Sequence, residues 1–222
     1  MKNWLKKWIF GSRKPRRVWT GPMAGLCYEL DPAWQTLFIV GLYECETYPW
    51  LNRFQRESRT FIDLGSGDGE LVVWALKKEE AELAIAVEIN PARNQTLNRN
   101  LALNGIAAGS HLRVIEQPIE VEGAADALTL EKLSKDCGDP IFLKIDIDGP
   151  EYDLLSGSPT FLKKHDVKLL IETHALDTER KLETFLQQLG YRTQVIRPAW
   201  WRMVIPEKRD LDHNQWMVAW RK

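Results

Sequence analysis

The residues with the clearest chemical potential are three glycines that follow an apolar run. The segment FIDLGSGDGE covers residues 61–70, and in it Asp63 precedes Gly65, Gly67 and Gly69 at alternate positions. Glycines at this spacing allow a tight turn and let a ligand approach backbone N–H groups closely. Such a turn between a strand and a helix indicates a site for a ligand that contains a nucleoside.

Two ligand classes compete for this turn. A dinucleotide fingerprint needs a small third residue at position 70, where this chain has Glu70, a poor neighbour for a pyrophosphate. S-adenosylmethionine has no pyrophosphate, and its methionine end carries an ammonium group that Asp63 can help to hold. The spacing therefore favours S-adenosylmethionine over NAD as the cofactor. We predict four cofactor-binding residues in this turn: Asp63, Gly65, Ser66 and Gly67.

Two residues on the following apolar runs are expected to complete the cofactor site. Glu88 lies at the end of the next run, about 20 residues past the glycine turn, where a carboxylate can accept both ribose hydroxyl protons. The third run ends near Glu116 and Gln117, and we assign Gln117 to the adenine edge.

A second set of polar residues provides the candidates for catalysis. Lys144, Asp146 and Asp148 alternate with apolar residues, and we interpret Lys144 as an ion-pair partner of one of these aspartates. Asp146 is placed where the cofactor meets the acceptor, and it is predicted both to bind the cofactor and to take part in catalysis. Glu172 and His174 end the next run, where they are predicted to remove a proton from the acceptor, with His174 as the general base.

The same side chains allow a different chemistry. Asp146, Asp148, Glu172 and His174 could instead gather a divalent cation that activates the acceptor. The sequence does not single out this alternative, so no metal ligand is assigned.

The elements that must position these residues alternate between strands and helices. Apolar runs predict strands at 59–64, 82–89, 111–119, 140–147, 167–174, 191–196 and 214–220. Helices are expected between them near 69–79, 90–104, 149–165 and 177–189, with a helical or looped stretch near 127–137. This alternation predicts a Rossmann-like, doubly wound α/β fold with a mostly parallel seven-stranded sheet. In such sheets ligands bind at the carboxyl ends of the strands, where the predicted site residues lie.

A distinct segment precedes this domain. Residues 1–17 carry only basic charge, and a helix over 1–10 would suit the surface of an anionic membrane, although a packing element or a frayed tail is an equally good interpretation. Asp31-Pro32 predicts the start of a helix over 33–44, and another helix is expected near 48–58. We therefore divide the chain into a basic tail with a small helical cap, 1–58, and a catalytic domain, 59–222.

Composition limits the partners and the compartment. The 222 residues suffice for one α/β domain, and a formal net charge of −1 gives no general attraction to nucleic acid, which we do not expect as a partner. Three cysteines without a CxxC pair, and the lack of an apolar run of about 20 residues, indicate a cytoplasmic protein, with peripheral membrane contact through 1–17 as an option. The oligomeric state is not indicated.

Four segments together resemble the FkbM family of S-adenosylmethionine-dependent methyltransferases. They are FIDLGSGDGE (61–70), VEINPARNQTLNRNLALNG (87–105), FLKIDIDGPEYDLLSG (142–157) and LLIETH (169–174). Gly41, Tyr43 and Glu44 also resemble the segment that precedes the cofactor turn in that family. The resemblance implies a class I methyltransferase fold and O-methylation of a hydroxyl on a sugar, a glycan or a small-molecule natural product.

Two departures from the family pattern leave the acceptor open. Ser66-Gly67 stands where the family commonly has Ala-Asn, and Asp148-Gly149-Pro150 stands where it commonly has Glu-Gly-Ala. A catalytically inactive methyltransferase-fold module that attaches to membranes is the alternative function, supported by the basic, tryptophan-bearing N-terminus. An NAD-dependent dehydrogenase is a third, and Glu70 argues against it.

Overall fold

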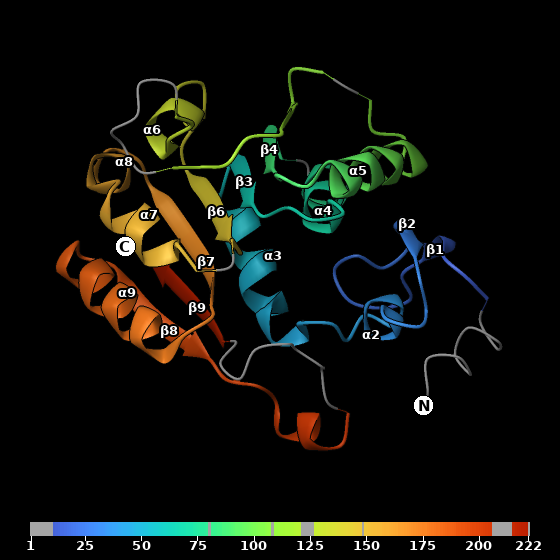
Figure 1. The fold of residues 1–222 in the computed structure, drawn as a ribbon. Helices are drawn as coiled ribbons and strands as arrows, with labels where there is room; N and C mark the ends of the chain where they lie inside the picture. Colours follow the sequence, from blue (N-terminus) through green and yellow to red (C-terminus); the bar gives the residue numbers. More distant parts are fainter. Residues whose placement is uncertain are drawn as a thin grey trace.

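A seven-stranded sheet is the centre of the molecule (Figure 1). The computed structural model describes residues 11–79, 81–107, 109–120, 127–147, 149–205 and 215–221. The strands are β3 (Thr60–Leu64), β4 (Leu83–Val87), β5 (Leu112–Ile115), β6 (Ile141–Ile145), β7 (Val167–Thr173), β8 (Arg192–Ile196) and β9 (Gln215–Trp220). They are ordered β5-β4-β3-β6-β7-β9-β8, and β9 runs antiparallel to both of its neighbours while the other pairs are parallel. The predicted doubly wound, mostly parallel sheet is confirmed.

The strand order reverses between β3 and β6, which lie side by side at the middle of the sheet. β4 follows β3 on one side, and the chain returns to add β6 on the other side. In register across this junction, Asp63 lies opposite Lys144. A crevice at the carboxyl ends of the strands is expected at such a reversal, and two of the predicted polar residues lie there.

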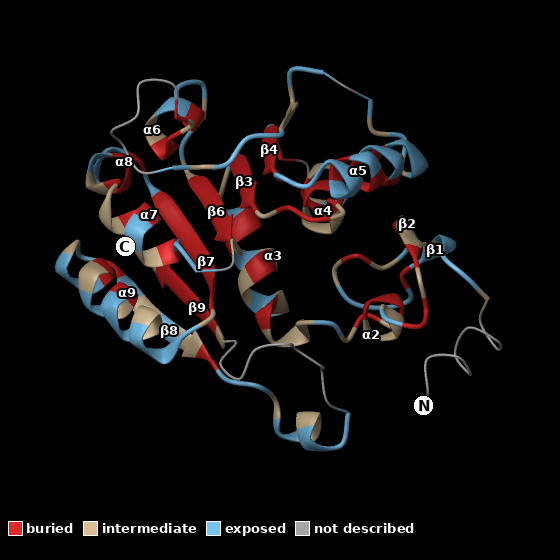
Figure 2. Ribbon diagram, in the orientation of Figure 1, coloured by how far each residue is buried: buried red, intermediate tan, exposed pale blue. Residues whose placement is uncertain are grey.

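Two apolar cores cover the two faces of the sheet. On one face, Phe61 and Phe142 pack with residues of α3 (Tyr48–Arg56), α4 (Glu70–Lys78) and α5 (Pro91–Leu103). On the other, Ile62 and Leu143 pack with residues of α6 (Leu130–Leu133), α7 (Glu151–Ser156), α8 (Pro159–Lys164) and α9 (Leu176–Gln188). Successive side chains on a strand point to opposite faces, so each central strand contributes to both cores. Figure 2 shows the buried strands between helices whose outer surfaces are exposed.

Two predicted helices differ in extent from those observed. The helix expected over 149–165 is two helices, because Gly157 ends α7 and Pro159, which has no N–H to donate, begins α8. In the stretch near 127–137, which was expected to be helical or looped, the helix contains only Leu130–Leu133. The helix after β4 begins as predicted, with the Asn90 side chain accepting a hydrogen bond from the Ala92 N–H.

The cap in front of the sheet is less helical than predicted. It begins with an antiparallel hairpin of β1 (Lys14–Arg17) and β2 (Cys27–Leu30), followed by α2 (Thr36–Ile39) and the 3₁₀ helix η1 (Cys45–Thr47). The prediction of one helix over 33–44 is wrong. The chain turns at Gly41, which has φ +73° and approaches Thr20 so closely that a Cβ would lie 2.1 Å from the Thr20 backbone oxygen. The helix considered for residues 1–10 lies outside the described residues.

The segment after β8 is fastened to this cap. It contains the 3₁₀ helix η2 (Trp200–Met203), from which Arg202 donates hydrogen bonds to Glu46 Oε1 at 2.8 Å and Glu46 Oε2 at 2.7 Å. Burial alone would raise the pKa of Glu46, but the hydrogen bonds from Arg202 and from the Ala199 N–H lower it to about 2. Among the described residues, no helix has the length and apolarity needed to cross a bilayer.

Candidate functional site

The turn between β3 and α4 can be built only with glycine at its critical positions. Gly65, Gly67 and Gly69 have φ values of +74°, +56° and +80°. A Cβ on Gly65 would lie 1.8 Å from the Asp146 backbone oxygen, and one on Gly69 would lie 2.6 Å from Leu97 Cγ. The first glycine therefore brings the turn against the end of β6, and the last lets α4 pack on α5.

Glu88 anchors the same turn from the end of β4. Its carboxylate accepts a hydrogen bond from the Gly67 N–H at Oε2 (2.9 Å) and one from the Asn90 N–H at Oε1 (2.8 Å). The residue is 7% exposed. Each carboxylate oxygen has a second lone pair, so these contacts leave capacity for the predicted ribose hydroxyls.

A buried lysine joins the two central strands and the turn. Lys144 Nζ lies 3.2 Å from Asp63 Oδ1 and 3.3 Å from Asp146 Oδ2, and it donates a hydrogen bond to the Gly65 oxygen. The predicted ion pairing of Lys144 is thus confirmed, whereas Asp148 lies outside the described residues. Burial raises the pKa of Asp63 to about 6, although Lys144 opposes the shift. Burial lowers the pKa of Lys144, but Asp63 and Asp146 outweigh this and hold it above its usual range.

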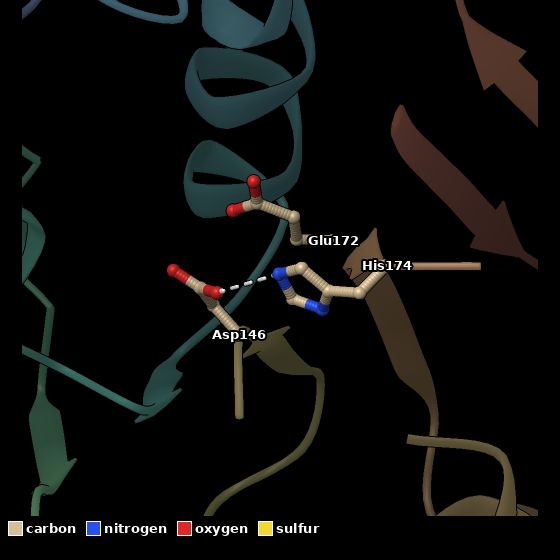
Figure 3. A group of neighbouring side chains, drawn as sticks. All are labelled: Asp146, Glu172 and His174. Atoms are coloured by element: carbon tan, nitrogen blue, oxygen red, sulfur yellow. Dashed lines mark ion pairs between the residues drawn. The ribbon is translucent and has the colours of Figure 1, made fainter. Parts of the chain in front are cut away.

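The three predicted catalytic residues lie together (Figure 3). Asp146, Glu172 and His174 place one ligand-type atom each within 4.8 Å of one another, and His174 Nε2 is 3.8 Å from Asp146 Oδ1. Such a group has the donor chemistry of a cation site. The Lys144 ammonium already pairs with Asp146 and the His174 ring lies beside it, so we interpret the group as an ion-paired cluster.

Glu151, which was not among the predicted site residues, completes this cluster. Its Oε1 lies 2.7 Å from His174 Nδ1, on the side of the ring away from Asp146. Burial lowers the pKa of His174, but the hydrogen bond with Glu151 and the charges of Glu151, Glu172 and Asp146 raise it above its usual value. The position of Glu151 in the segment 142–157, which carries the family resemblance, was the signal that could have identified this residue.

A cavity of about 870 Å³ lies between the glycine turn and the cap. Five of the predicted residues line it: Asp63, Gly65, Ser66, Gly67 and Asp146. Glu88, Glu172 and His174 lie behind this lining, and Gln117 is exposed and does not line the cavity. The roles predicted for these residues stay predictions.

Sequence reasoning missed the contribution of the cap and the start of α4 to this cavity. Cap side chains form much of its wall, among them Arg13, Met23, Trp34, Phe38, Tyr43 and Glu44. At the start of α4, Glu70 also faces the cavity, and burial together with the nearby Asp68 carboxylate raises its pKa to about 7. Because the cap residues are distant in sequence from the glycine turn, no local pattern predicts their contact with it.

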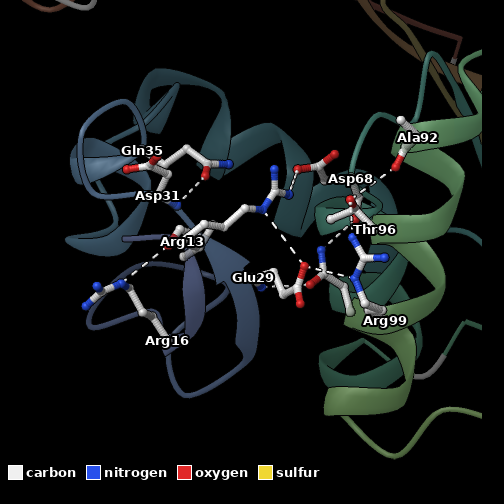
Figure 4. Close-up of polar contacts among 11 residues, drawn as sticks. Arg13, Arg16, Glu29, Asp31, Gln35, Asp68, Ala92, Thr96 and Arg99 are labelled. Carbon is white, nitrogen blue, oxygen red and sulfur yellow. Dashed lines mark hydrogen bonds and ion pairs between the residues drawn. The ribbon is translucent and has the colours of Figure 1, made fainter. Parts of the chain in front are cut away.

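Ion pairs hold the cap against the glycine turn (Figure 4). Arg13 Nη2 lies 2.8 Å from Oδ2 of Asp68 in the turn, and Oε2 of Glu29 in β2 lies 2.9 Å from Nε of Arg99 in α5. Asn100 of α5 accepts a hydrogen bond from the Glu29 N–H and donates one to the Asp68 oxygen. The cap, α5 and the turn therefore form one connected wall.

Comparisons with known proteins agree with this geometry. The family model described as "Methyltransferase FkbM domain" matches residues 43–193, more than half of the chain. No curated protein matches the chain.

Solved structures share the fold at low sequence identity. The FkbM methyltransferase of Methylobacillus flagellatus KT is 18% identical with a TM-score of 0.58, over 74% of this chain and 44% of that one. A precorrin-6y C5,15-methyltransferase from Geobacter metallireducens GS-15 is 18% identical with a TM-score of 0.52, and the match covers 80% of this chain and 88% of that one. TYW2 of M. jannaschii, solved in complex with AdoMet, is 16% identical with a TM-score of 0.52, and the match covers 94% of this chain and 84% of that one.

Proposed function

Because the chain belongs to the FkbM family of S-adenosylmethionine-dependent methyltransferases, we propose that it methylates a hydroxyl group on a sugar, a glycan or a small-molecule natural product. The observation that carries this proposal is the position of Asp146. Its side chain lines the cavity, its backbone contacts the glycine turn, and its carboxylate meets His174. A group that can accept a proton therefore lies next to the place where the methyl donor is expected.

The residues of the turn fit S-adenosylmethionine. Gly65 and Gly67 line the cavity, and without side chains they let a ligand approach the backbone of the turn closely. Carboxylates of Asp63, Asp68 and Glu70 surround the turn and complement a donor that carries a sulfonium and an ammonium group. We assign Asp63, Gly65, Ser66, Gly67 and Asp146 to the donor, with Glu88 at the ribose and Gln117 at the adenine edge. Bound S-adenosylmethionine supplies an electrophilic methyl group.

The acceptor hydroxyl needs help to become a nucleophile. An alcohol holds its proton tightly at neutral pH, so a positioned base is required as the oxygen attacks. Asp146 is the member of the cluster that reaches the cavity, and His174 and Glu172 lie behind it. We propose that these three residues accept the hydroxyl proton while the walls of the cavity align the acceptor with the methyl group.

The cap supplies the side chains expected of an acceptor site. Trp34, which is 74% exposed, and Tyr43 stand on the cavity wall with Phe38 beneath them. Flat aromatic rings pack against the C–H faces of sugars and of polycyclic small molecules. The carboxylates around the turn disfavour a phosphate backbone, so we do not propose nucleic acid as an acceptor.

The tail and the compartment remain proposals. In the described part of the basic segment, Arg13 pairs with Asp68, and Arg17 donates to the Gly25 oxygen, so these charges bond within the protein. Any contact of residues 1–17 with an anionic membrane would then rest mainly on residues before Arg13. Cys27, Cys45 and Cys137 form no disulfide with one another, which suits the cytoplasm.

The proposal is tested by radiolabel transfer. The full chain is incubated with S-[methyl-³H]adenosylmethionine and a panel of methyl glycosides and hydroxylated aromatic compounds. We expect label on at least one hydroxyl, and a loss of turnover of about 100-fold in Asp146→Asn. Asp136→Asn, whose side chain is 82% exposed in a surface pair with Arg113, is the control. Full activity of Asp146→Asn would overturn the assignment.

A further inference from the structure

We propose that Glu151 is a positioning residue, which fixes the ring of His174 so that a proton can pass from the acceptor through Asp146 to His174 Nε2. This inference rests on the proposed function, and it gives a role to a buried carboxylate that the assignment above does not use. Figure 3 shows the His174 ring and Asp146 facing each other.

The burial of Glu151 requires such a role. The side chain is fully buried, as the first residue of α7, and its Oε1 accepts a hydrogen bond from the Gly149 N–H at 3.0 Å and lies 2.7 Å from His174 Nδ1. An ionised carboxylate without water is unfavourable unless it is paired and hydrogen-bonded. The contact with His174 Nδ1 supplies a polar partner for this buried carboxyl group.

This contact decides which ring nitrogen is available for chemistry. A neutral imidazole has one N–H donor and one acceptor nitrogen. With the proton on Nδ1 held by Glu151, the acceptor is Nε2, which faces Asp146 Oδ1 at 3.8 Å. The order Glu151, His174, Asp146 leads from the buried start of α7 to the cavity.

The charges around His174 favour uptake of a proton. Glu151 faces it from α7, Glu172 from β7 and Asp146 from the end of β6. Lys144 opposes them through its contact with Asp146 at 3.3 Å. In the proposed step the acceptor oxygen bonds to the methyl carbon, the carbon–sulfur bond breaks with its electron pair left on sulfur, and the hydroxyl proton moves to Asp146 and then to Nε2. The resulting imidazolium lies against the Glu151 carboxylate and later returns its proton to water.

Nitrogen-15 NMR of histidine-labelled protein tests the positioning without an acceptor. In the wild type, we expect the neutral ring of His174 to carry its proton on Nδ1. Glu151→Gln keeps an acceptor oxygen but removes the charge, so the pKa of His174 should fall by about one unit. Glu151→Met removes the acceptor as well, and a mixture of tautomers should appear. His165, which pairs with Asp139 at 3.1 Å, is the internal control and should not change.

Two NMR results would overturn the inference. One is a wild-type His174 ring protonated on Nε2 in its neutral form. The other is an unchanged His174 titration in Glu151→Gln, while its circular dichroism and the His165 signals match the wild type.

Kinetics separate this inference from the proposed function. With an acceptor from the panel, Glu151→Gln should lower kcat about tenfold with little change in KM, and Glu151→Asp should recover part of the loss. In a His174→Gln background, Glu151→Gln should have little further effect, because it acts through the ring. An equal loss in both backgrounds would contradict the positioning role. Full activity of His174→Gln would instead refute the proposed proton acceptor.

Discussion

At the scale of single residues, Gly65 is required by the fold and is also one of the residues proposed to bind the cofactor. It has φ +74°, and a Cβ would lie 1.8 Å from the Asp146 backbone oxygen. We expect Gly65→Ala to destabilise the protein by about 3 kcal/mol or more, because backbone must move, and to abolish binding of S-adenosylmethionine. Gly190→Ala is the matched control, since Gly190 has φ +83° with nothing within 4 Å of the added Cβ. It should lose only about 1–2 kcal/mol in urea unfolding. Equal losses would show that only backbone strain matters at Gly65.

Glu70 is expected to make donor binding depend on pH. Burial and Asp68 raise its pKa to about 7, so it is largely protonated at pH 6 and largely ionised at pH 8. The ionised form should attract the positively charged donor, so affinity should rise about three- to tenfold between these pH values. Calorimetric titration across this range measures the change.

Two comparisons isolate the contribution of Glu70. Glu70→Gln should remove most of the pH dependence, and the demethylated product, which lacks the sulfonium charge, should depend on pH less than the donor does. A rise that persists unchanged in Glu70→Gln would assign the titration to another group.

The residues that sequence reasoning identified share one property, which is a position at the end of an apolar run. Asp63 lies near the end of β3, Glu88 follows β4 and Asp146 follows β6, and strand ends can be predicted from local pattern. Glu151 was missed because its contact with His174 joins positions 23 residues apart in the sequence. Gln117 also follows a strand, yet it is exposed, because side-chain direction after a strand end is not determined by the run itself.

At the scale of elements, the segment around η2 is held by a pair whose strength depends on pH. The folded pKa of Glu46 is about 2, below its usual 4.5, so the pair stabilises the fold above about pH 4.5 and the stabilisation is lost as the pH falls toward 2. In urea unfolding, Glu46→Gln should be less stable than wild type by about 1–3 kcal/mol at pH 7, and the difference should shrink toward pH 2.

A surface pair gives the contrast for this prediction. Glu82 pairs with Arg59 at 2.7 Å, but its side chain is 59% exposed, so Glu82→Gln should change stability much less than Glu46→Gln at pH 7. A difference between wild type and Glu46→Gln that does not vary with pH would contradict the account.

Elements with strong local signals were predicted, and those that depend on tertiary contacts were not. The Asn90-Pro91 start of α5 was correct because the cap forms within one turn of the helix. The hairpin of β1 and β2 was missed because its basic residues resemble a tail, although Arg13 and Arg17 bond to distant backbone and side chains. The prediction of a helix over 33–44 was wrong because the chain turns at Gly41, where the backbone lies close to Thr20.

At the scale of the whole molecule, the sheet order creates the site and the cap encloses it. The reversal between β3 and β6 brings Asp63 to Lys144, which also pairs with Asp146, and Arg13, just before the hairpin, pairs with Asp68 of the glycine turn. The alternation of strands and helices was enough to predict the doubly wound sheet. It could not predict that residues between Arg13 and Leu51 contribute a wall of the same cavity, because that arrangement depends on packing between distant segments.

Calorimetric titration of S-adenosylmethionine into wild type and Glu88→Gln tests the central claim most directly, since it requires no acceptor. Glu88 holds the Gly67 N–H and is expected to meet the ribose, so wild type should bind with a Kd in the micromolar range and Glu88→Gln should lose at least about tenfold in affinity. Glu82→Gln, on the surface, should bind like wild type. Absence of binding by folded wild-type protein, or equal affinity in Glu88→Gln, would contradict the cofactor site described above.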